Sequence, residues 1–251
     1  MRRKGLDFKK LTDIALSLLV LAGSVGLAWV GLRESKSLPV MASPNETSLP
    51  ISAESIPAEA IAVVIDAGHG GFDGGAVGTK TGVIEAELNL SVAKLLADEL
   101  TRRGMYVIMT RTDGEAIGAT KDADMKRRKE IMNLPNVDLV VSVHMNKFRD
   151  VSVSGPMVFY MKGSDEGKSL AESVMFSLCE ALDRPKRIAN PEDLFVLRVP
   201  SAPSVLVECG FLSNADDEAK LITEEYQRKL ARGIAEGISN YLAQKENGDN
   251  E

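Results

Sequence analysis

Hydrophobic and amphipathic stretches alternate along the chain from about residue 61 onward. The run IAVVID at 61–66 is apolar until its last residue, as expected for a strand that is buried on both faces of a sheet. Apolar side chains then recur at helical spacing from Leu88 to Leu100, and Gly104 follows as a C-cap. This part of the chain therefore predicts a strand followed by a helix.

The same alternation continues toward the C-terminus. Further strands are predicted at 105–111, 137–144, 155–161, 194–197 and 204–208, and further helices at 122–133, 165–182 and 226–242. Residues 184–193 are predicted to form a loop. Strands that alternate with helices indicate an α/β fold. We therefore expect a single domain at 59–245, with a mostly parallel or mixed central sheet flanked by helices.

The N-terminal part of the chain departs from this pattern. A basic segment at 1–13 precedes an uncharged apolar run at 14–32, which is long enough to span a membrane as a helix. Because a basic flank stays in the cytoplasm, we predict a transmembrane signal anchor; a cleaved signal peptide is the alternative. Residues 33–58 are predicted to be a flexible linker and 246–251 a disordered tail. The domain is expected outside the cytoplasm, either membrane-anchored or secreted.

Composition narrows the classes of function. The chain of 251 residues has a formal net charge of −6, which disfavours general nucleic-acid binding because phosphate neutralisation requires a basic surface. Cys179 and Cys209 are too few for a disulfide framework and do not form a Cys-x-x-Cys site, although a single bridge between them stays open. The chain contains only two histidines, His69 and His144.

The residues that carry chemistry lie where predicted elements begin or end. His69 follows the first strand in a glycine-rich loop, and His144 ends the strand at 137–144. Glu208 ends the last strand, and Glu85 opens the first helix. Because ligands of such sheets bind beyond the carboxyl ends of the strands, we expect these four side chains to converge at one edge of the sheet.

Two imidazoles and a carboxylate are a common set of ligands for catalytic zinc, and they leave one position for water. Glu208 fits the role of a general base beside such a site, because a carboxylate that follows an apolar strand is costly to bury without a function. Glu85 has two interpretations on spacing alone: a ligand, or an acidic residue that favours a helix N-terminus. Asp66 either orients His69 through a hydrogen bond or is a turn residue.

Four motifs, in order along the chain, resemble those of the zinc N-acetylmuramoyl-L-alanine amidases of the Amidase_3 type. The motifs are DAGHGG with GGAVG at 66–78, Glu85-x-x-x-Asn89-Leu90, Arg128 and Asn133 with 138–146, and VECGFLSN at 207–214. The match covers about 61–243, nearly the whole predicted domain. Ala67 stands where proline is common in the family, a departure that should not disturb the chemistry.

The resemblance implies that His69, Glu85 and His144 bind Zn²⁺, which favours the ligand interpretation of Glu85. It also implies that Glu208 is catalytic. The bond that such enzymes cut is the amide between N-acetylmuramic acid and the L-alanine of the peptidoglycan stem peptide. Other residues of the motifs are expected to support the ligands or to contact substrate: Asp66, Arg128 and Asn146.

A bare catalytic domain behind an N-terminal anchor is most similar to the sporulation- and germination-specific branch of this family. Those amidases trim stem peptides of the spore cortex before muramic-δ-lactam forms, which implies a polysaccharide deacetylase acting downstream. The resemblance also leaves room for an activator protein. Two other functions stay open: a zinc peptidase that acts within the stem peptide, and a degenerate wall-binding protein. Retention of all four motif residues argues against the degenerate protein.

Overall fold

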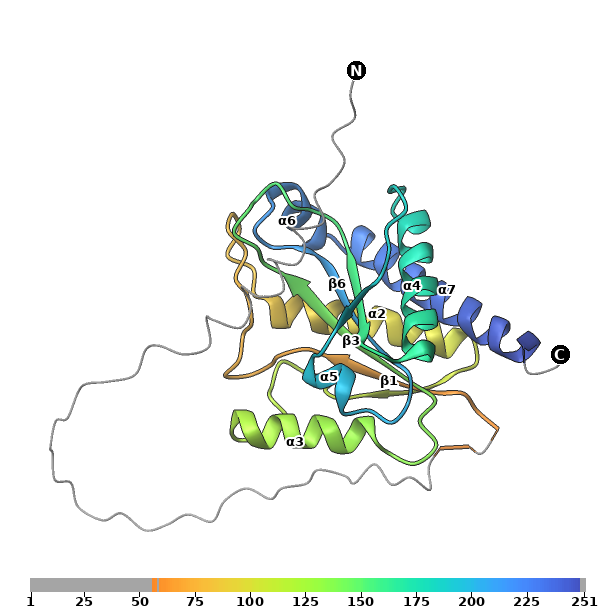
Figure 1. Ribbon diagram of the computed structural model, residues 1–251. Helices are drawn as coiled ribbons and strands as arrows, with labels where there is room; N and C mark the ends of the chain where they lie inside the picture. Colours follow the sequence, from red (N-terminus) through yellow and green to blue (C-terminus); the bar gives the residue numbers. More distant parts are fainter. Residues whose placement is uncertain (1–55, 58, 249–251) are drawn as a thin grey trace, which may run out of the picture. The chain divides into compact units, whose positions relative to one another are not determined.

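The structure is a computed structural model that describes residues 56, 57 and 59–248. The predicted cytoplasmic segment and signal anchor, and most of the predicted linker, lie outside the described residues. No helix within the described part of the chain is long and apolar enough to cross a membrane. The described residues form one compact α/β unit (Figure 1).

A mixed sheet of six strands forms the centre of the domain, in the order β2-β1-β3-β6-β4-β5. The strands are β1 (Ala62–Ala67), β2 (Tyr106–Met109), β3 (Leu139–Asn146), β4 (Met157–Met161), β5 (Asn190–Glu192) and β6 (Ser204–Phe211). Strands β2, β1, β3 and β6 run parallel, β4 is antiparallel to β6, and β5 is parallel to β4. The predicted single α/β domain with a mixed sheet is therefore confirmed.

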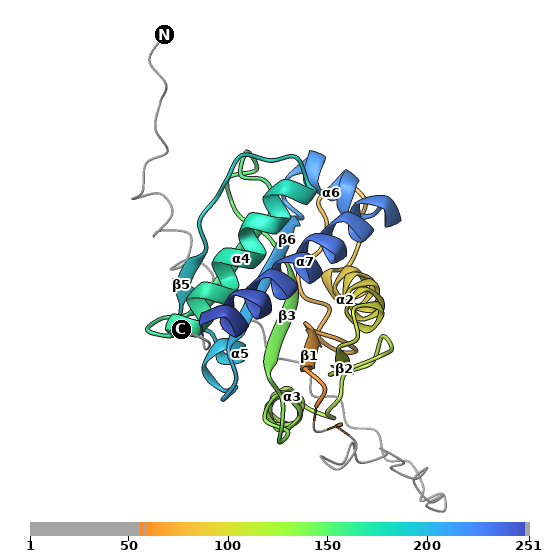
Figure 2. The same cartoon turned by 90° about the vertical axis from the view of Figure 1, so that its right-hand side faces the viewer.

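Helices cover both faces of this sheet. One face carries α2 (Glu85–Arg102), α4 (Asp165–Ala181) and α7 (Glu224–Gly248). In Figure 2, α4 and α7 lie in front of the strands. The other face carries α3 (Lys121–Met132) and the single turn α5 (Phe195–Arg198). The short helix α6 (Ala215–Leu221) packs near the end of β6.

The continuous apolar run of β1 is explained by this two-sided cover. Val63, Ile65 and Ala67 face the core beneath α2, α4 and α7. Ala62 and Val64 face the second core beneath α3 and α5. Because successive side chains of a strand point to opposite faces, a strand between two helical layers needs apolar residues at every position.

Two predicted elements near the sheet edge are wrong. The segment 194–197, predicted as a strand, is the N-cap residue and first turn of α5, which places Val196 and Leu197 in the core. A run of four apolar residues fits a buried helical turn as well as a strand, so periodicity could not separate them. The predicted loop 184–193 contains β5, which pairs with β4 although it includes Pro191. Proline is tolerated there because β5 is an edge strand.

One helix was not predicted, and another extends further than predicted. Helix α6 was not predicted, although Asn214 caps it by accepting hydrogen bonds from the amides of Asp216 and Asp217. An asparagine followed by acidic residues is a helix-start signal that could have located it. Helix α7 continues to Gly248, so residues 246–248, assigned to a disordered tail, are helical.

Arg128 joins α3 to the end of β1 through a buried ion pair with Asp66. Its Nη1 atom lies 2.6 Å from Asp66 Oδ1, and its Nε atom lies 2.7 Å from Asp124 Oδ2. Thr110 and Ser142 donate hydroxyl hydrogen bonds to Asp66. Burial raises the pKa of Asp66, but Arg128 and these hydroxyls outweigh burial and hold it below its ordinary value. Since α3 buries only two apolar side chains, this pair is a main attachment of the helix.

Replacement of Arg128 should be strongly destabilising. Arg128→Ala is expected to lower the free energy of unfolding by about 3–5 kcal/mol, because it leaves the buried Asp66 without its cation. Arg127→Ala is the matched control: Arg127 pairs with Glu130 at the surface, where the side chains are 38% and 48% exposed. Its loss should cost at most about 1 kcal/mol. Urea unfolding followed by circular dichroism measures both; equal losses would contradict the role given to Arg128.

Candidate metal centre

His69, Glu85 and His144 meet at the carboxyl edge of the sheet. His69 lies two residues beyond β1, Glu85 is the first residue of α2, and His144 lies within β3. Nε2 of His69 is 3.2 Å from Glu85 Oε1, and Nδ1 of His144 is 3.0 Å from the same oxygen. One ligand atom from each side chain lies within 4.8 Å of the others, so the three residues could hold a metal ion.

Glu85 is the centre of this cluster. Backbone amides of Ala76 and Met145 donate hydrogen bonds of 2.8 and 3.2 Å to its two oxygens, and the Asn89 side chain donates one of 3.3 Å. Burial raises the pKa of Glu85, but the two imidazoles outweigh burial and hold it well below its ordinary value. Glu85 is therefore an ionised carboxylate with both histidines directed at one oxygen.

The backbone that carries His69 is held by two buried arginines. His69 has a positive φ of 61°, which is uncommon for a residue with a side chain. Arg128 donates a hydrogen bond of 2.5 Å to the His69 carbonyl. Arg111 donates hydrogen bonds of 2.9 Å to the carbonyls of Ala67 and Gly68. These contacts hold the strained backbone at His69 in place, and this backbone sets the position of the His69 ring.

Two glycines are required by the close approach of the cluster to the backbone. A Cβ atom on Gly68 would lie 2.2 Å from Cε1 of His144. Gly75 has a φ of +69°, and a Cβ atom there would lie 2.6 Å from Glu85 Oε2. Any larger residue at either position would displace one of the three candidate ligands, which explains why glycines occupy these positions of the loop.

A carboxylate that sequence reasoning missed contacts the outer side of His69. Asp73 Oδ1 lies 3.0 Å from Nδ1 of His69. Sequence reasoning considered Asp66 for this role, but the Asp66 carboxylate is bonded to Arg128, Thr110 and Ser142. Burial lowers the pKa of His69, but Glu85 and Asp73 outweigh it and raise the pKa to about 9. Binding of a metal ion would therefore displace a proton from His69 at neutral pH.

Glu208 lies beside the cluster on the neighbouring strand. It pairs in register with His144 across β3 and β6, so the two side chains project from the same side of the sheet. Its Oε2 atom is shielded from solvent and has no hydrogen-bond partner within the described residues. Burial, with the charge of Glu85 added to it, raises the pKa of Glu208 well above its ordinary value. A carboxyl group in this setting holds a proton readily.

The remaining predicted site residues have other positions. Asn146 is buried at the end of β3, where its carbonyl accepts a hydrogen bond of 2.7 Å from the Leu212 amide. Its side-chain amide lies 4.0 Å from the Met157 sulfur. Asn146 therefore links the end of β3 to the segment just after β6 and to β4. Cys179 and Cys209 are both buried and free, so the disulfide that the sequence left open does not form.

The donor set fits a divalent metal ion such as zinc. Two imidazole nitrogens and one carboxylate oxygen are ordinary ligands of catalytic zinc sites. The structure adds two features that such a site needs. One is the room that Gly68 and Gly75 leave at the cluster, and the other is an unpartnered acid, Glu208, next to it.

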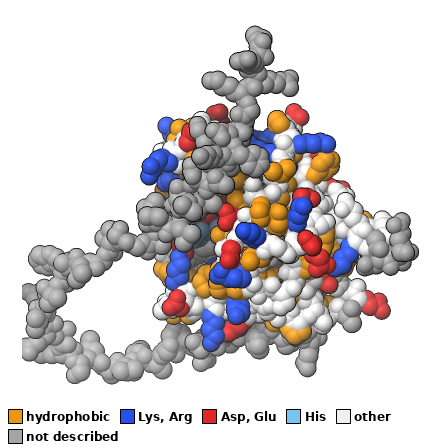
Figure 3. Space-filling model, viewed as in Figure 1, with side chains coloured by type: hydrophobic (Ala, Val, Ile, Leu, Met, Phe, Trp, Pro, Cys, Tyr) orange, Lys and Arg blue, Asp and Glu red, His pale blue; other side chains and the backbone are white. Residues whose placement is uncertain are grey.

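Exposed apolar side chains border this cluster. Phe72, Val77 and Ile84 are 59%, 46% and 37% exposed, and all three lie on the loop that joins His69 to Glu85. Val77 and Ile84 are paired in an isolated β-bridge. Exposed apolar residues gathered near a functional site are typical of a surface that contacts a ligand. On the face shown in Figure 3, acidic and basic side chains are interspersed, and they do not form a basic surface.

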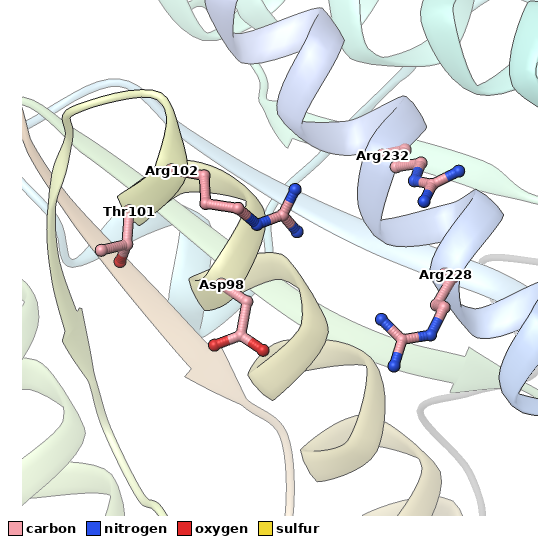
Figure 4. A pocket seen from close by; sticks show the side chains of 5 residues that line it. All are labelled: Asp98, Thr101, Arg102, Arg228 and Arg232. Atoms are coloured by element: carbon pink, nitrogen blue, oxygen red, sulfur yellow. The ribbon is translucent and has the colours of Figure 1, made fainter.

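A groove lies elsewhere on the domain, between the C-terminal half of α2 and α7 (Figure 4). It has a volume of about 540 Å³ and is lined by Asp98, Thr101, Arg102, Arg228 and Arg232. Each of the three arginines is paired with a glutamate, Glu99 or Glu224, so the groove offers no uncompensated positive charge to an anion. The candidate metal cluster lies at the opposite end of α2, where Glu85 is the first residue of the helix.

Comparison with known proteins identifies the family of the chain. The profile of the family described as N-acetylmuramoyl-L-alanine amidase matches residues 63–240. A germination-specific N-acetylmuramoyl-L-alanine amidase of Bacillus subtilis strain 168 is 32% identical over 200 residues, which cover 76% of this chain and 84% of that protein. The uncharacterized protein YqiI of the same strain is 33% identical over 200 residues, covering 79% of this chain and 93% of that protein.

A solved structure gives the same result. The CwlD amidase of Clostridioides difficile, in complex with the GerS lipoprotein, superposes with a TM-score of 0.70. It is 33% identical in sequence, and the match covers 73% of this chain and 98% of that one. The span that the family profile matches, residues 63–240, extends over nearly all of the described domain. The chain belongs to the N-acetylmuramoyl-L-alanine amidase family.

Proposed function

We propose that this amidase cleaves its peptidoglycan bond with a zinc ion held by His69, Glu85 and His144, and with Glu208 as the catalytic acid and base. The observation that carries the proposal is the convergence of these three ligand atoms beside the unpartnered oxygen of Glu208. Membership of the amidase family identifies the bond as the amide between N-acetylmuramic acid and the L-alanine of the stem peptide.

The roles of the residues follow from their positions. A zinc ion at this site would act as a Lewis acid that polarises the scissile carbonyl and makes a water molecule acidic near neutral pH. Glu208 accepts the proton that this water loses as its oxygen attacks the carbonyl carbon. Glu208 then donates that proton to the alanine nitrogen as the C–N bond breaks. Burial holds the pKa of Glu208 above its ordinary value, so the carboxyl group retains the proton until the alanine nitrogen takes it.

The spore cortex is the substrate that we favour. Support comes from similarity to a germination-specific amidase of Bacillus subtilis and to the CwlD amidase of Clostridioides difficile. The exposed apolar side chains of Phe72, Val77 and Ile84 provide a surface for the uncharged parts of the stem peptide. In this role, a polysaccharide deacetylase would act next on the stripped muramic acid to allow muramic-δ-lactam to form.

Further parts of the proposal concern location and partners. The complex of the CwlD amidase with the GerS lipoprotein supports an activator of the lipoprotein class for this chain. The signal anchor proposed at 14–32 would hold the domain outside the cytoplasm, where peptidoglycan lies. If the segment is cleaved, the domain is secreted to the same side of the membrane.

Product analysis tests the bond that is cut. The zinc-loaded protein is incubated with cortex and vegetative peptidoglycan, and the products are analysed by mass spectrometry and by labelling of new amino termini. The expected products are stem peptides with a free N-terminal L-alanine and lactyl sugars without a peptide. A zinc peptidase would instead release a D-residue or a cross-bridge amine. Release of a D-residue or a cross-bridge amine, without a new N-terminal alanine, would contradict the proposed bond.

Glu208→Gln separates catalysis from metal binding. The amide cannot accept the proton of water, so kcat should fall by at least about 100-fold. Zinc content, measured by inductively coupled plasma mass spectrometry, should stay at the wild-type level because Glu208 is not a ligand. Glu87→Gln is the matched control, since Glu87 is an exposed carboxylate in the first turn of α2. Full turnover by Glu208→Gln, or loss of its zinc, would show that the assigned role is wrong.

A further inference from the structure

Asp73 contacts the ring nitrogen of His69 that points away from Glu85. Asp73 Oδ1 lies 3.0 Å from Nδ1 of His69, whereas Nε2 of the same ring faces Glu85 at 3.2 Å. We propose that Asp73 is a positioning residue: it accepts the Nδ1–H hydrogen bond of His69 and so presents Nε2 to the zinc ion. This inference rests on the zinc site proposed above and concerns a residue outside the ligand set.

The conformation of the loop aims Asp73 at His69. Backbone hydrogen bonds in both directions between Gly70 and Asp73, of 2.8 and 3.0 Å, close a tight turn directly after His69. The turn brings a side chain four residues later back to the ring, without a helix. The Gly75 amide donates a hydrogen bond of 3.2 Å to Asp73 Oδ1, and Lys121 Nζ lies 3.5 Å from Oδ2. The carboxylate is therefore fixed by groups other than His69.

Lys121 makes α3 a second support for His69. Lys121 is the first residue of α3. Arg128, further along the same helix, donates a hydrogen bond to the His69 carbonyl. Lys121 thus contacts Asp73, which holds the His69 side chain, and Arg128 holds the His69 backbone. Both contacts bear on a residue whose backbone has a positive φ and would otherwise relax.

His144 is held in a different way, which makes the role of Asp73 specific to one ligand. The His144 ring packs against Gly68, where an added Cβ atom would lie 2.2 Å from Cε1 and 2.3 Å from Nε2. Steric contact with the backbone therefore sets the orientation of His144. The His69 side chain is 24% exposed, compared with 17% for His144. The orientation of the His69 ring therefore depends on its hydrogen bond to Asp73, whereas packing orients the His144 ring.

Zinc affinity tests this inference without reference to hydrolysis. Full-length wild type, Asp73→Ala and Asp73→Asn are titrated with zinc against a chromophoric chelator. Asp73→Ala should raise the zinc Kd by roughly 10- to 100-fold, the usual effect of removing the hydrogen-bond partner of a ligating histidine. Asp73→Asn keeps an oxygen acceptor, so its Kd should lie between those of the wild type and Asp73→Ala.

Asp113→Ala is the matched control for a general effect on the loops. Asp113 makes the same kind of turn contact as Asp73, accepting a hydrogen bond of 3.0 Å from the amide two residues later. Gly71 donates to the carbonyl of the next residue, Gly114, so the control lies against the same glycine-rich loop. Its zinc Kd should stay at the wild-type value.

A nuclear magnetic resonance signal reports the hydrogen bond itself. Because the chain has two histidines, the ring N–H protons of the zinc-loaded protein give few signals to assign. The Nδ1–H proton of His69 should appear as a slowly exchanging downfield signal in the wild type and should be lost in Asp73→Ala. An unchanged Kd and a retained signal in Asp73→Ala would overturn the inference, as would an equal loss of affinity in Asp113→Ala. Failure of the wild type to bind zinc would instead overturn the proposed function.

Discussion

Glu85 brings a negative charge to a buried position at the edge of the sheet, where only 4% of the residue is exposed. An isolated carboxylate there would cost several kcal/mol, of the order found for buried ions in proteins, unless donors surround it. Both histidines approach one oxygen, and backbone amides from the loop before α2 and from β3 donate to the carboxylate. These groups come from the loop after β1, from β3 and from the loop that leads into α2. The metal-binding cluster and the packing of the sheet edge therefore depend on the same contacts.

Positive charge buried behind the cluster completes this arrangement. Arg111 and Arg128 donate to the three successive carbonyls from Ala67 to His69, which leave the β1 ladder as the chain turns. The Asp66 carboxylate neutralises the charge of Arg128, and this ion pair attaches α3 to β1 of the sheet. The Asp66 carboxylate thus supports His69 through an arginine and the backbone. Rigid support of this kind is what a metal site needs if its ligands are to keep their geometry before the ion binds.

The sequence predicted most of what depends on local pattern. Continuous apolar runs identified β1 and β3, and the rule that strands end at a common edge brought His69, His144 and Glu208 together. Glu85 was ambiguous until the motifs were compared with a family, because an acid at a helix N-terminus has an ordinary explanation. Asp73 was missed because its contact depends on the path of the turn after His69. Helix α5 and strand β5 were misassigned because such short elements are decided by tertiary contacts and carry little periodicity of their own.

The central claim is that one zinc ion is bound by His69, Glu85 and His144 while Glu208 stays outside the coordination sphere. Anomalous X-ray diffraction from crystals of the zinc-loaded protein, recorded on both sides of the zinc absorption edge, tests this claim directly. We expect one anomalous peak about 2.0–2.2 Å from Nε2 of His69, Nδ1 of His144 and a Glu85 oxygen, the usual zinc–ligand distances. A peak bound by Glu208, or a peak away from these three residues, would contradict it.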